Sequence, residues 1–370
     1  MAELLTNTTD LTKVASAIRE KGGTSDQLVY PDGFVMAIQA IQTGTELKIV
    51  VSVTSGATVT ATKGSLSVSG TSVNNSCTLT VPEAGTWNVK ATLGGLTSDA
   101  KSISITGIYD VTLSFVSSTL NNNDWATIKE VSDKGQGANY WSVGDCKAVT
   151  LNGTVGTLTL SNYTIYAFIL GFNHNAELEG QNRIHFQLGK TALSGGTDVA
   201  LCDYAYNNMG GGFRMNTSNT NNGGWESSQM RTAICGTSLT SYSGTILAVI
   251  PAALRAVLKS VTKYTNNIGN SYAETAVTAT TDYFFLLSEY EVFGAKKYSN
   301  VDEKNKQAQY AYYSAGNSKI KYNHGATSTA VIVWLRSSAY QAYFVSVKVD
   351  GTVDTQFAGY SEGFAPGFCV

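Results

Sequence analysis

The sequence predicts a mainly β protein with some α-helix, and three observations support this fold class. Aliphatic residues alternate with polar residues through long parts of the chain, as they do in strands that bury one face. Glycine is frequent, with 36 residues, whereas proline is rare, with 4 residues. The hydrophobic content is 43%, which is enough for a folded core, so we do not expect a disordered chain.

The first 43 residues predict a short helical attachment segment made of two helices. Apolar residues at i, i+3, i+4 and i+7 indicate the first helix: Leu11, Val14, Ala15 and Ile18. Asp10 is its candidate N-cap. A second apolar stripe follows a Tyr-Pro-Asp-Gly turn: Phe34, Ala37, Ile38 and Ile41. A helical hairpin this small buries little surface, so we expect it to dock on another surface or to oligomerise. The alternative is that these two helices simply cover the N-terminal end of the next domain.

Residues 44–107 predict a small β-sandwich. Alternating segments recur at roughly 8–12-residue intervals and are separated by turn residues. We expect Trp87 to pack in the core of this sandwich. The pattern resembles the immunoglobulin-like spacer domains of phage tail proteins and bacterial surface proteins. The resemblance implies a spacer or adhesive role and no chemistry of its own.

Residues 108–370 predict one larger α+β domain. A helix is expected over 123–131 with Asp124 as its cap, and two more are expected over 227–234 and 251–258. Strands are expected over 147–151, 158–160, 164–173, 261–264, 283–287, 329–335 and 344–349. Asp350-Gly351 indicates a tight hairpin turn after the last of these strands.

Several motifs in this domain resemble a large phage and prophage family. They are Asp124-Trp125-Ala126, the segments 140–145, 169–174, 184–187 and 223–231, Trp334-Leu335-Arg336-Ser337, and the terminal segment 363–370. The resemblance implies a C-type-lectin-like fold of the kind used in phage receptor-binding proteins and in the variable proteins of diversity-generating retroelements. The N-terminal hairpin also resembles N-terminal segments of phage tail proteins.

The C-terminal motif departs from the family pattern Gly-Val-Arg-Pro-Ala-Phe. Phe364, Ala365 and Gly367 stand where Val, Arg and Ala are usual. This departure fits a region in which side chains vary on a fixed frame, and it suggests diversification by a retroelement. The candidate positions are 338–343, 356–360, 362, 364, 365 and 367.

Aromatic and small polar residues are concentrated near the C-terminus, and we interpret them as a ligand-binding face. Tyrosine gives contact area at low entropic cost, and small polar residues adapt to a partner. The candidate site residues are Ser338, Tyr340, Gln341, Tyr343, Gln356, Phe357, Tyr360, Glu362, Phe364 and Ala365. The segment 216–225 is expected to form a neighbouring loop. Five residues are expected to hold the frame: Trp225, Met230, Arg231, Trp334 and Arg336.

Signals for catalysis or cofactor binding are weak, so we expect no enzyme activity, no cofactor and no metal. His174 and His185 lack a metal-binding spacing or an adjacent carboxylate in the sequence, which favours structural histidines. The Glu-Pro-Asn and Gln-Pro-Asp triplets of calcium-dependent lectins are absent from the sequence. The alternative is a cell-surface glycan hydrolase with Asp282, Glu289 or Glu291 as its acids. A solvated strand face is the favoured interpretation of Glu289 and Glu291.

The net charge and the length of the apolar runs limit the classes of partner that we expect, and the cysteine spacing predicts the state of the thiols. The chain has 25 Lys+Arg and 27 Asp+Glu, a net charge of −2, which argues against nucleic-acid binding. No apolar run reaches the roughly 18–20 residues of a membrane span. The five cysteines are widely spaced, which predicts free, mostly buried thiols.

The sequence therefore favours a phage tail receptor-binding protein, made in the host cytoplasm and carried on the virion at the tail tip or fibre. It would bind a host cell-surface protein or glycan and attach to other tail proteins through its N-terminal segment. The resemblance to phage fibres implies a homotrimer. A prophage-encoded bacterial adhesin is a further alternative.

Overall fold

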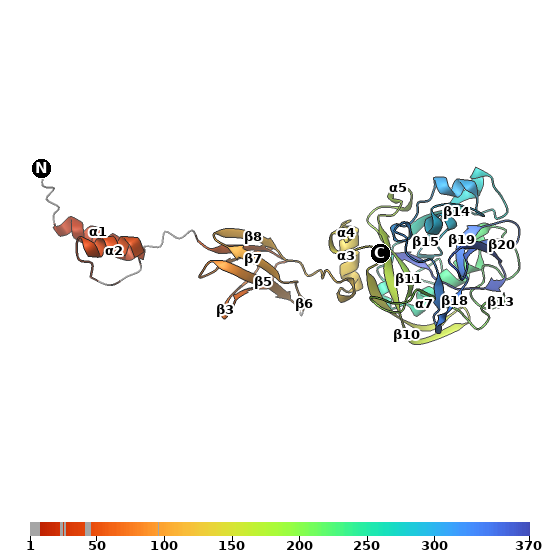
Figure 1. Cartoon of the computed structure of the whole chain (residues 1–370), viewed down its shortest axis with the longest axis horizontal. Coiled ribbons are helices and arrows are strands. Elements are labelled where there is room, and N and C mark those ends of the chain that lie inside the picture. The colour runs from red at the N-terminus through yellow and green to blue at the C-terminus, as the bar shows by residue number, and fades with distance from the viewer. Residues whose placement is uncertain (1–7, 23–24, 26, 41–45, 95) are drawn as a thin grey trace. The chain divides into compact units, whose positions relative to one another are not determined.

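The computed structural model describes residues 8–22, 25, 27–40, 46–94 and 96–370. The protein is mainly β with some α, as predicted (Figure 1). The chain divides into two compact units, Met1–Phe115 and Val116–Val370. Each unit has its own hydrophobic core, so each is described by itself. No helix of the described segments is long and apolar enough to span a membrane.

Two helices, α1 (Thr8–Gly22) and α2 (Asp32–Ala40), form the N-terminal hairpin. Ala15, Ile18 and Phe34 are buried between them, as the apolar spacing predicted. Asp10 lies inside α1, so its expected role as the N-cap is wrong. Val14 and Ile38 were expected in the buried stripes but are exposed, and Ile41 lies outside the described residues. The hairpin therefore has a very small core.

The remainder of the first unit is a sandwich of two β-sheets. One sheet has the order β4-β1-β8, with bounds Ser76–Thr80, Lys48–Ser52 and Ile108–Thr112. The other has the order β3-β2-β5-β6, with bounds Leu66–Thr71, Thr58–Lys63, Gly85–Leu93 and Leu96–Thr97, and β7 (Lys101–Ile105) also pairs with β5. Trp87 is fully buried between the sheets, as predicted.

The sandwich ends later than residue 107, the boundary that the sequence suggested. Strand β8 pairs in parallel with β1, from Lys48↔Ile108 to Ser52↔Thr112. Val111 and Leu113 are buried in the sandwich core. Thr106 and Gly107 are only the connection between β7 and β8. The C-terminal unit therefore begins at Val116.

A five-stranded antiparallel sheet with the order β16-β23-β11-β10-β9 forms the centre of the C-terminal unit. The strands are Phe284–Phe285, Gly367–Cys369, Ile184–Lys190, Leu158–Phe172 and Cys146–Val155. The two strands expected over 158–173 are one strand, with a register shift between Leu160 and Tyr163. The C-terminal strand β23 lies between β11 and β16, so the end of the chain belongs to the core.

Smaller sheets surround the central one. The sheet β19-β20-β21 comprises Val333–Ser338, Tyr343–Val347 and Val353–Phe357. The pair β13 and β22 comprises Asn208–Met209 and Tyr360–Ser361, and the pair β14 and β15 comprises Val261–Asn266 and Val277–Asp282. The sheet β12-β17-β18 comprises Val199–Ala200, Lys321–Asn323 and Ala326–Val331. Gly351 has φ 82° in the turn between β20 and β21, which confirms the predicted hairpin.

Short helices connect these strands. The expected helix with the Asp124 cap is confirmed as α3 (Trp125–Asp133), because the Asp124 side chain accepts a hydrogen bond from the Thr127 backbone N–H. The other α-helices are Gly137–Tyr140, Ala176–Glu179, Gly224–Ser227, Ile246–Val249, Ala252–Arg255, Glu289–Phe293 and Ala311–Ser314, labelled α4 to α10. The helix expected over 227–234 is instead the end of α6 followed by a π-helical turn, Met230–Cys235. The helix expected over 251–258 is limited to α8.

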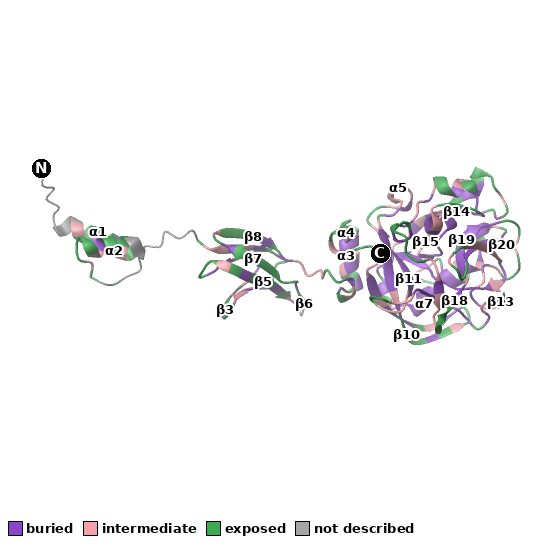
Figure 2. Cartoon of the chain, viewed as in Figure 1, coloured by how far each residue is buried: buried purple, intermediate pink, exposed green. Residues whose placement is uncertain are grey.

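Burial is high in strands β11, β19, β20 and β23 of the C-terminal unit, whereas β13 and most of β18 are exposed (Figure 2). All five cysteines of the chain lie in the described segments, and each is buried with a free thiol, as predicted. The frame residues Trp225, Met230, Trp334 and Arg336 are fully or almost fully buried. These side chains therefore belong to the rigid interior and are not part of a contact surface.

Candidate functional site

Four aromatic side chains form a continuous row on the surface of the C-terminal unit. The ring centroids of Tyr340 and Tyr343 are 4.9 Å apart, those of Tyr343 and Phe357 are 4.3 Å apart, and those of Phe357 and Tyr360 are 6.0 Å apart. Tyr340 is 44% exposed, and the other three side chains are half-buried. We call these four residues the aromatic ridge. The structure thus brings together four of the five aromatic residues that the sequence proposed as exposed ligand contacts, and Phe364 is the exception.

Strand pairing explains why these side chains meet. Tyr343 on β20 lies directly opposite Phe357 on β21, and cross-strand partners place their side chains on the same face of a sheet. The Tyr343 N–H donates to the Tyr340 carbonyl at 3.1 Å, which holds Tyr340 beside the start of β20. Tyr360 on β22 pairs with Met209 on β13. Met209 is 52% exposed, so it extends the apolar surface beyond Tyr360.

The loop 216–225 supports both sides of the ridge, as expected for a neighbouring loop. Asn221 is fully buried, and its Nδ2 donates to the carbonyls of Ala339 at 2.9 Å and Tyr343 at 3.1 Å. The Asn219 side chain accepts a hydrogen bond from the Gly359 N–H at 3.1 Å. These bonds fix the backbone from which the ridge side chains project.

Four of the expected contact residues are buried, which corrects the predicted site. Ser338 donates its hydroxyl to the Asn266 carbonyl at 3.3 Å. Phe364 stacks on Phe213 in the core, with centroids 5.2 Å apart. The Ala365 carbonyl accepts a hydrogen bond from Gln187. Glu362 is also buried. Ser338 is buried because it ends the buried strand β19, whereas the other three are buried because the chain turns inward after Tyr360 to enter the central sheet.

The two expected glutamine contacts remain close to the surface. Gln341 is exposed and has φ 42°, a left-handed conformation in the turn before β20. Gln356 is half-buried on β21. Gly367, a candidate for diversification, is buried in β23, and a Cβ there would lie 2.8 Å from the Phe285 ring. A variable position at 367 is therefore sterically disfavoured.

Glu362 is unusual because both of its carboxylate oxygens are buried without a hydrogen-bond partner. Burial raises the pKa of this carboxyl group to about 8. Gln356 approaches the group and partly offsets this effect, without a hydrogen bond of normal geometry. The folded protein therefore holds Glu362 protonated near neutral pH.

A second candidate is a buried cluster of charged residues in the C-terminal unit. Lys263 on β14 donates to Glu179 at 2.6 Å, to Glu291 at 2.9 Å and to the Tyr310 hydroxyl at 2.9 Å. Arg336 on β19 binds both oxygens of Glu291, with an Nη2–Oε1 distance of 2.9 Å. Two cations thus face two carboxylates in a site without solvent exposure.

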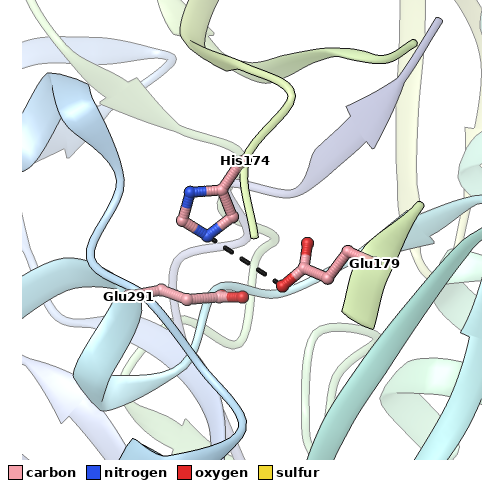
Figure 3. A group of neighbouring side chains, drawn as sticks. All are labelled: His174, Glu179 and Glu291. Atoms are coloured by element: carbon pink, nitrogen blue, oxygen red, sulfur yellow. Dashed lines mark ion pairs between the residues drawn. The ribbon is translucent and has the colours of Figure 1, made fainter. Parts of the chain in front are cut away.

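Two histidines border this cluster. Figure 3 shows the His174 ring with its Nε2 turned toward Glu179, and these atoms are 3.9 Å apart. His185 contacts the Tyr310 hydroxyl through Nδ1 at 3.1 Å. The Nε2 atoms of both histidines lack a hydrogen-bond partner. Burial, with a further contribution from Lys263, lowers the pKa of His174 to about 3 and also lowers the pKa of His185, so both rings are neutral.

The carboxylates near His174 correct the expectation that none accompanies the histidines. Ligand atoms of His174, Glu179 and Glu291 all lie within 4.8 Å of one another (Figure 3). Sequence spacing could not reveal this group, because its members come from separate elements. The ammonium group of Lys263 already contacts both carboxylates. A divalent cation would add uncompensated positive charge to a dry site, so the arrangement fits an ion-pair network better than a metal centre.

The pKa values of the two carboxylates shift in opposite directions because their charged partners differ. It raises the pKa of Glu179 to about 7, despite the neighbouring Lys263. Burial also acts to raise the pKa of Glu291, but Arg336 and Lys263 outweigh it and hold that pKa below its usual range. Glu291 is therefore the permanently ionised centre of the cluster.

The acids of the alternative hydrolase are structural in this fold. Glu289 and Glu291 lie in helix α9 and are buried, so a solvated strand face is wrong. The helix forms because Ser288 and Glu291 make a capping box. Glu289 accepts hydrogen bonds from three successive backbone N–H groups, those of residues 297–299. Asp282 accepts from Trp225 at 3.0 Å and Arg231 at 2.6 Å. None of the three faces an open groove, as a sugar-cleaving pair would need.

Comparisons with known proteins add one resemblance. Residues 199–370 match a family model described as a domain of unknown function (DUF6273). The comparisons with curated proteins and with solved structures gave no match. The matched segment is similar to that family over the whole aromatic ridge and over Lys263, Glu291 and Arg336, whereas His174, Glu179 and His185 precede it.

Proposed function

We propose that this protein is a phage tail receptor-binding protein whose C-terminal unit adheres to a host cell surface through the aromatic ridge. The observation that carries the binding proposal is the continuous row of four partly exposed aromatic side chains. The phage assignment and the C-type-lectin-like fold rest on the sequence motifs alone. A prophage-encoded adhesin would use the same surface.

The position of the ridge supports a binding role. In Figure 1, β13 and β20 lie on the side of the C-terminal unit away from α3 and α4, where the chain enters that unit. The ridge is held by strand pairing and by the buried Asn221, so a partner would meet a preorganised surface. Preorganisation lowers the entropic cost of association.

The proposed mechanism is reversible adhesion without catalysis or a cofactor. Each head would bind weakly, and several heads on one virion would bind strongly, because tethering raises the effective concentration of the remaining heads. A homotrimer and attachment to other tail proteins through the N-terminal hairpin are part of this proposal. The protein would act at the tail tip or fibre.

Retroelement diversification, if it acts on this gene, would fall on the exposed part of the predicted site. The surface positions are Tyr340, Gln341, Tyr343, Gln356, Phe357 and Tyr360. Substitutions there change the contact surface without opening the core. Sequencing sibling loci tests this point: a nearby template repeat with differences at these codons supports it, and identical codons throughout overturn it.

Binding of fluorescently labelled protein to a panel of bacterial strains tests the main proposal. On strains that bind the wild type, Phe357→Ala is expected to reduce binding at least tenfold, because Phe357 touches two other rings of the ridge. The matched control is Tyr204→Ala, since Tyr204 is 83% exposed and forms no ring contact with the ridge among the described residues. Undiminished binding by a folded Phe357→Ala variant would overturn the proposal.

A further inference from the structure

We propose that the ridge recognises a protein surface and not a glycan. This inference rests on the proposed binding function and names the partner class for the same site. It depends on how the rings face one another, on the residue that extends the ridge, and on the charge of its surroundings.

The ring faces inside the ridge are closed to sugars. Tyr343 and Phe357 have centroids only 4.3 Å apart with an interplanar angle of 31°, and the Tyr340–Tyr343 pair is similarly close. A pyranose placed between two rings needs carbon contacts of about 3.5–4.0 Å to each ring. The two rings would therefore have to lie roughly twice that distance apart. The neighbouring ring already occupies this space. A sugar therefore cannot insert between these neighbouring rings of the ridge.

Met209 closes the Tyr360 end of the row with a different apolar group. It is the cross-strand partner of Tyr360, and it is more than half exposed. Methionine is flexible and polarizable, and protein interfaces are enriched in both methionine and aromatic residues. A surface that joins four aromatic rings to an exposed methionine matches the composition of an interface core.

The charge around the ridge limits the partner further. None of the four ridge residues or Met209 is charged, and at the opposite end of the β20–β21 hairpin Lys348 and Asp354 pair with each other at 3.4 Å. The complementary surface is therefore uncharged and apolar at its centre. The Tyr340 hydroxyl makes only a long contact of 3.5 Å to Thr355, so it is available to bond a backbone group of the partner.

Treatment of target cells separates the two partner classes. Cells that bind the wild type are exposed to proteinase K, which removes surface proteins, or to periodate, which oxidises vicinal diols of glycans. Protease is expected to reduce binding at least tenfold, and periodate is expected to change it less than twofold. The reverse pattern would overturn the protein assignment while leaving the binding function intact. Loss after both treatments would also overturn it, because a purely protein contact requires no glycan.

A variant at the Met209 end of the ridge gives a test that does not depend on cell treatment. Met209→Ala is expected to weaken binding three- to tenfold, with Tyr204→Ala unchanged. Equal binding by folded Met209→Ala and wild type would contradict a contact surface that includes the methionine. If Phe357→Ala also binds normally, the proposed function fails together with this inference. Thermal unfolding of each variant verifies that it is folded.

Discussion

Arg336 binds both carboxylate oxygens of Glu291 in the interior of the C-terminal unit. This pair links strand β19 to helix α9, and β19 leads directly into the turn that carries Tyr340. Lys263 joins the same carboxylate from β14. The ion pair therefore ties together three elements behind the ridge and helps to fix the surface on which binding is proposed.

Replacing Glu291 with glutamine tests the structural role of this cluster. Glu291→Gln keeps the shape of the side chain but leaves the buried Arg336 and Lys263 without their shared counter-charge. Loss of one member of a buried ion pair typically costs about 3–5 kcal/mol of unfolding free energy. Chemical denaturation measures the change, with Glu177→Gln on the exposed side of α5 as the control. A loss below about 1 kcal/mol would contradict this role.

Asn221 gives a second prediction, because it supports the ridge without belonging to it. Asn221→Ala removes the hydrogen bonds to the Ala339 and Tyr343 carbonyls and leaves the Ala339 carbonyl without that donor. We expect a loss of about 1–3 kcal/mol in stability, together with weaker binding to target cells. Asn222→Ala, on the exposed neighbour, should change neither quantity. Normal binding by a destabilised Asn221→Ala variant would show that the loop does not position the ridge.

The sequence predicted elements that depend on local chemistry. The Asp124 cap, the buried Trp87 and the turn at Gly351 each follow from a few neighbouring residues, and all three are confirmed. The aromatic ridge was also foreseen as a set of surface side chains. Its order could not be foreseen, because Tyr343 and Phe357 become neighbours only through the register of β20 and β21.

Contacts between distant segments account for what the sequence did not predict. Glu179, Lys263 and Glu291 come from α5, β14 and α9, so no motif spacing connects them. Phe364 and Ala365 looked like surface residues because they follow exposed aromatics. They are buried because β23 inserts between β11 and β16, a long-range pairing that periodicity cannot reveal.

Glu362 predicts a specific dependence of stability on pH. Burial raises its pKa from the ordinary value of 4.5 to about 8 in the folded protein. Between these values the folded state retains a proton that the unfolded chain has released, so this residue makes stability fall as the pH rises. Glu362→Gln mimics the protonated form and removes the effect.

The difference in unfolding free energy between Glu362→Gln and wild type measures this contribution. It should increase from pH 5 to about pH 8 and then level off, reaching more than about 1 kcal/mol in favour of the variant. The exposed Glu274→Gln provides the control and should show no such trend. A difference that is constant with pH would mean that Glu362 is ionised in the folded protein.

The N-terminal hairpin gives the last prediction, because it buries too little to be stable alone. Only Ala15, Ile18 and Phe34 are buried among its described side chains, whereas Val35 and Met36 on α2 are exposed, Met36 by 69%. Helix α2 carries no charge after Asp32, and a charge-free face can meet its own copy without repulsion. We therefore expect the proposed homotrimer to depend on this face. Light scattering after size-exclusion chromatography should show that Val35→Glu/Met36→Glu lowers the mass of the full chain from trimer to monomer.

Lys21→Glu is the control for this substitution. It changes the net charge by the same amount, at an exposed position on α1, and should leave the trimer intact. A trimer that survives the double substitution would place its contacts elsewhere in the chain.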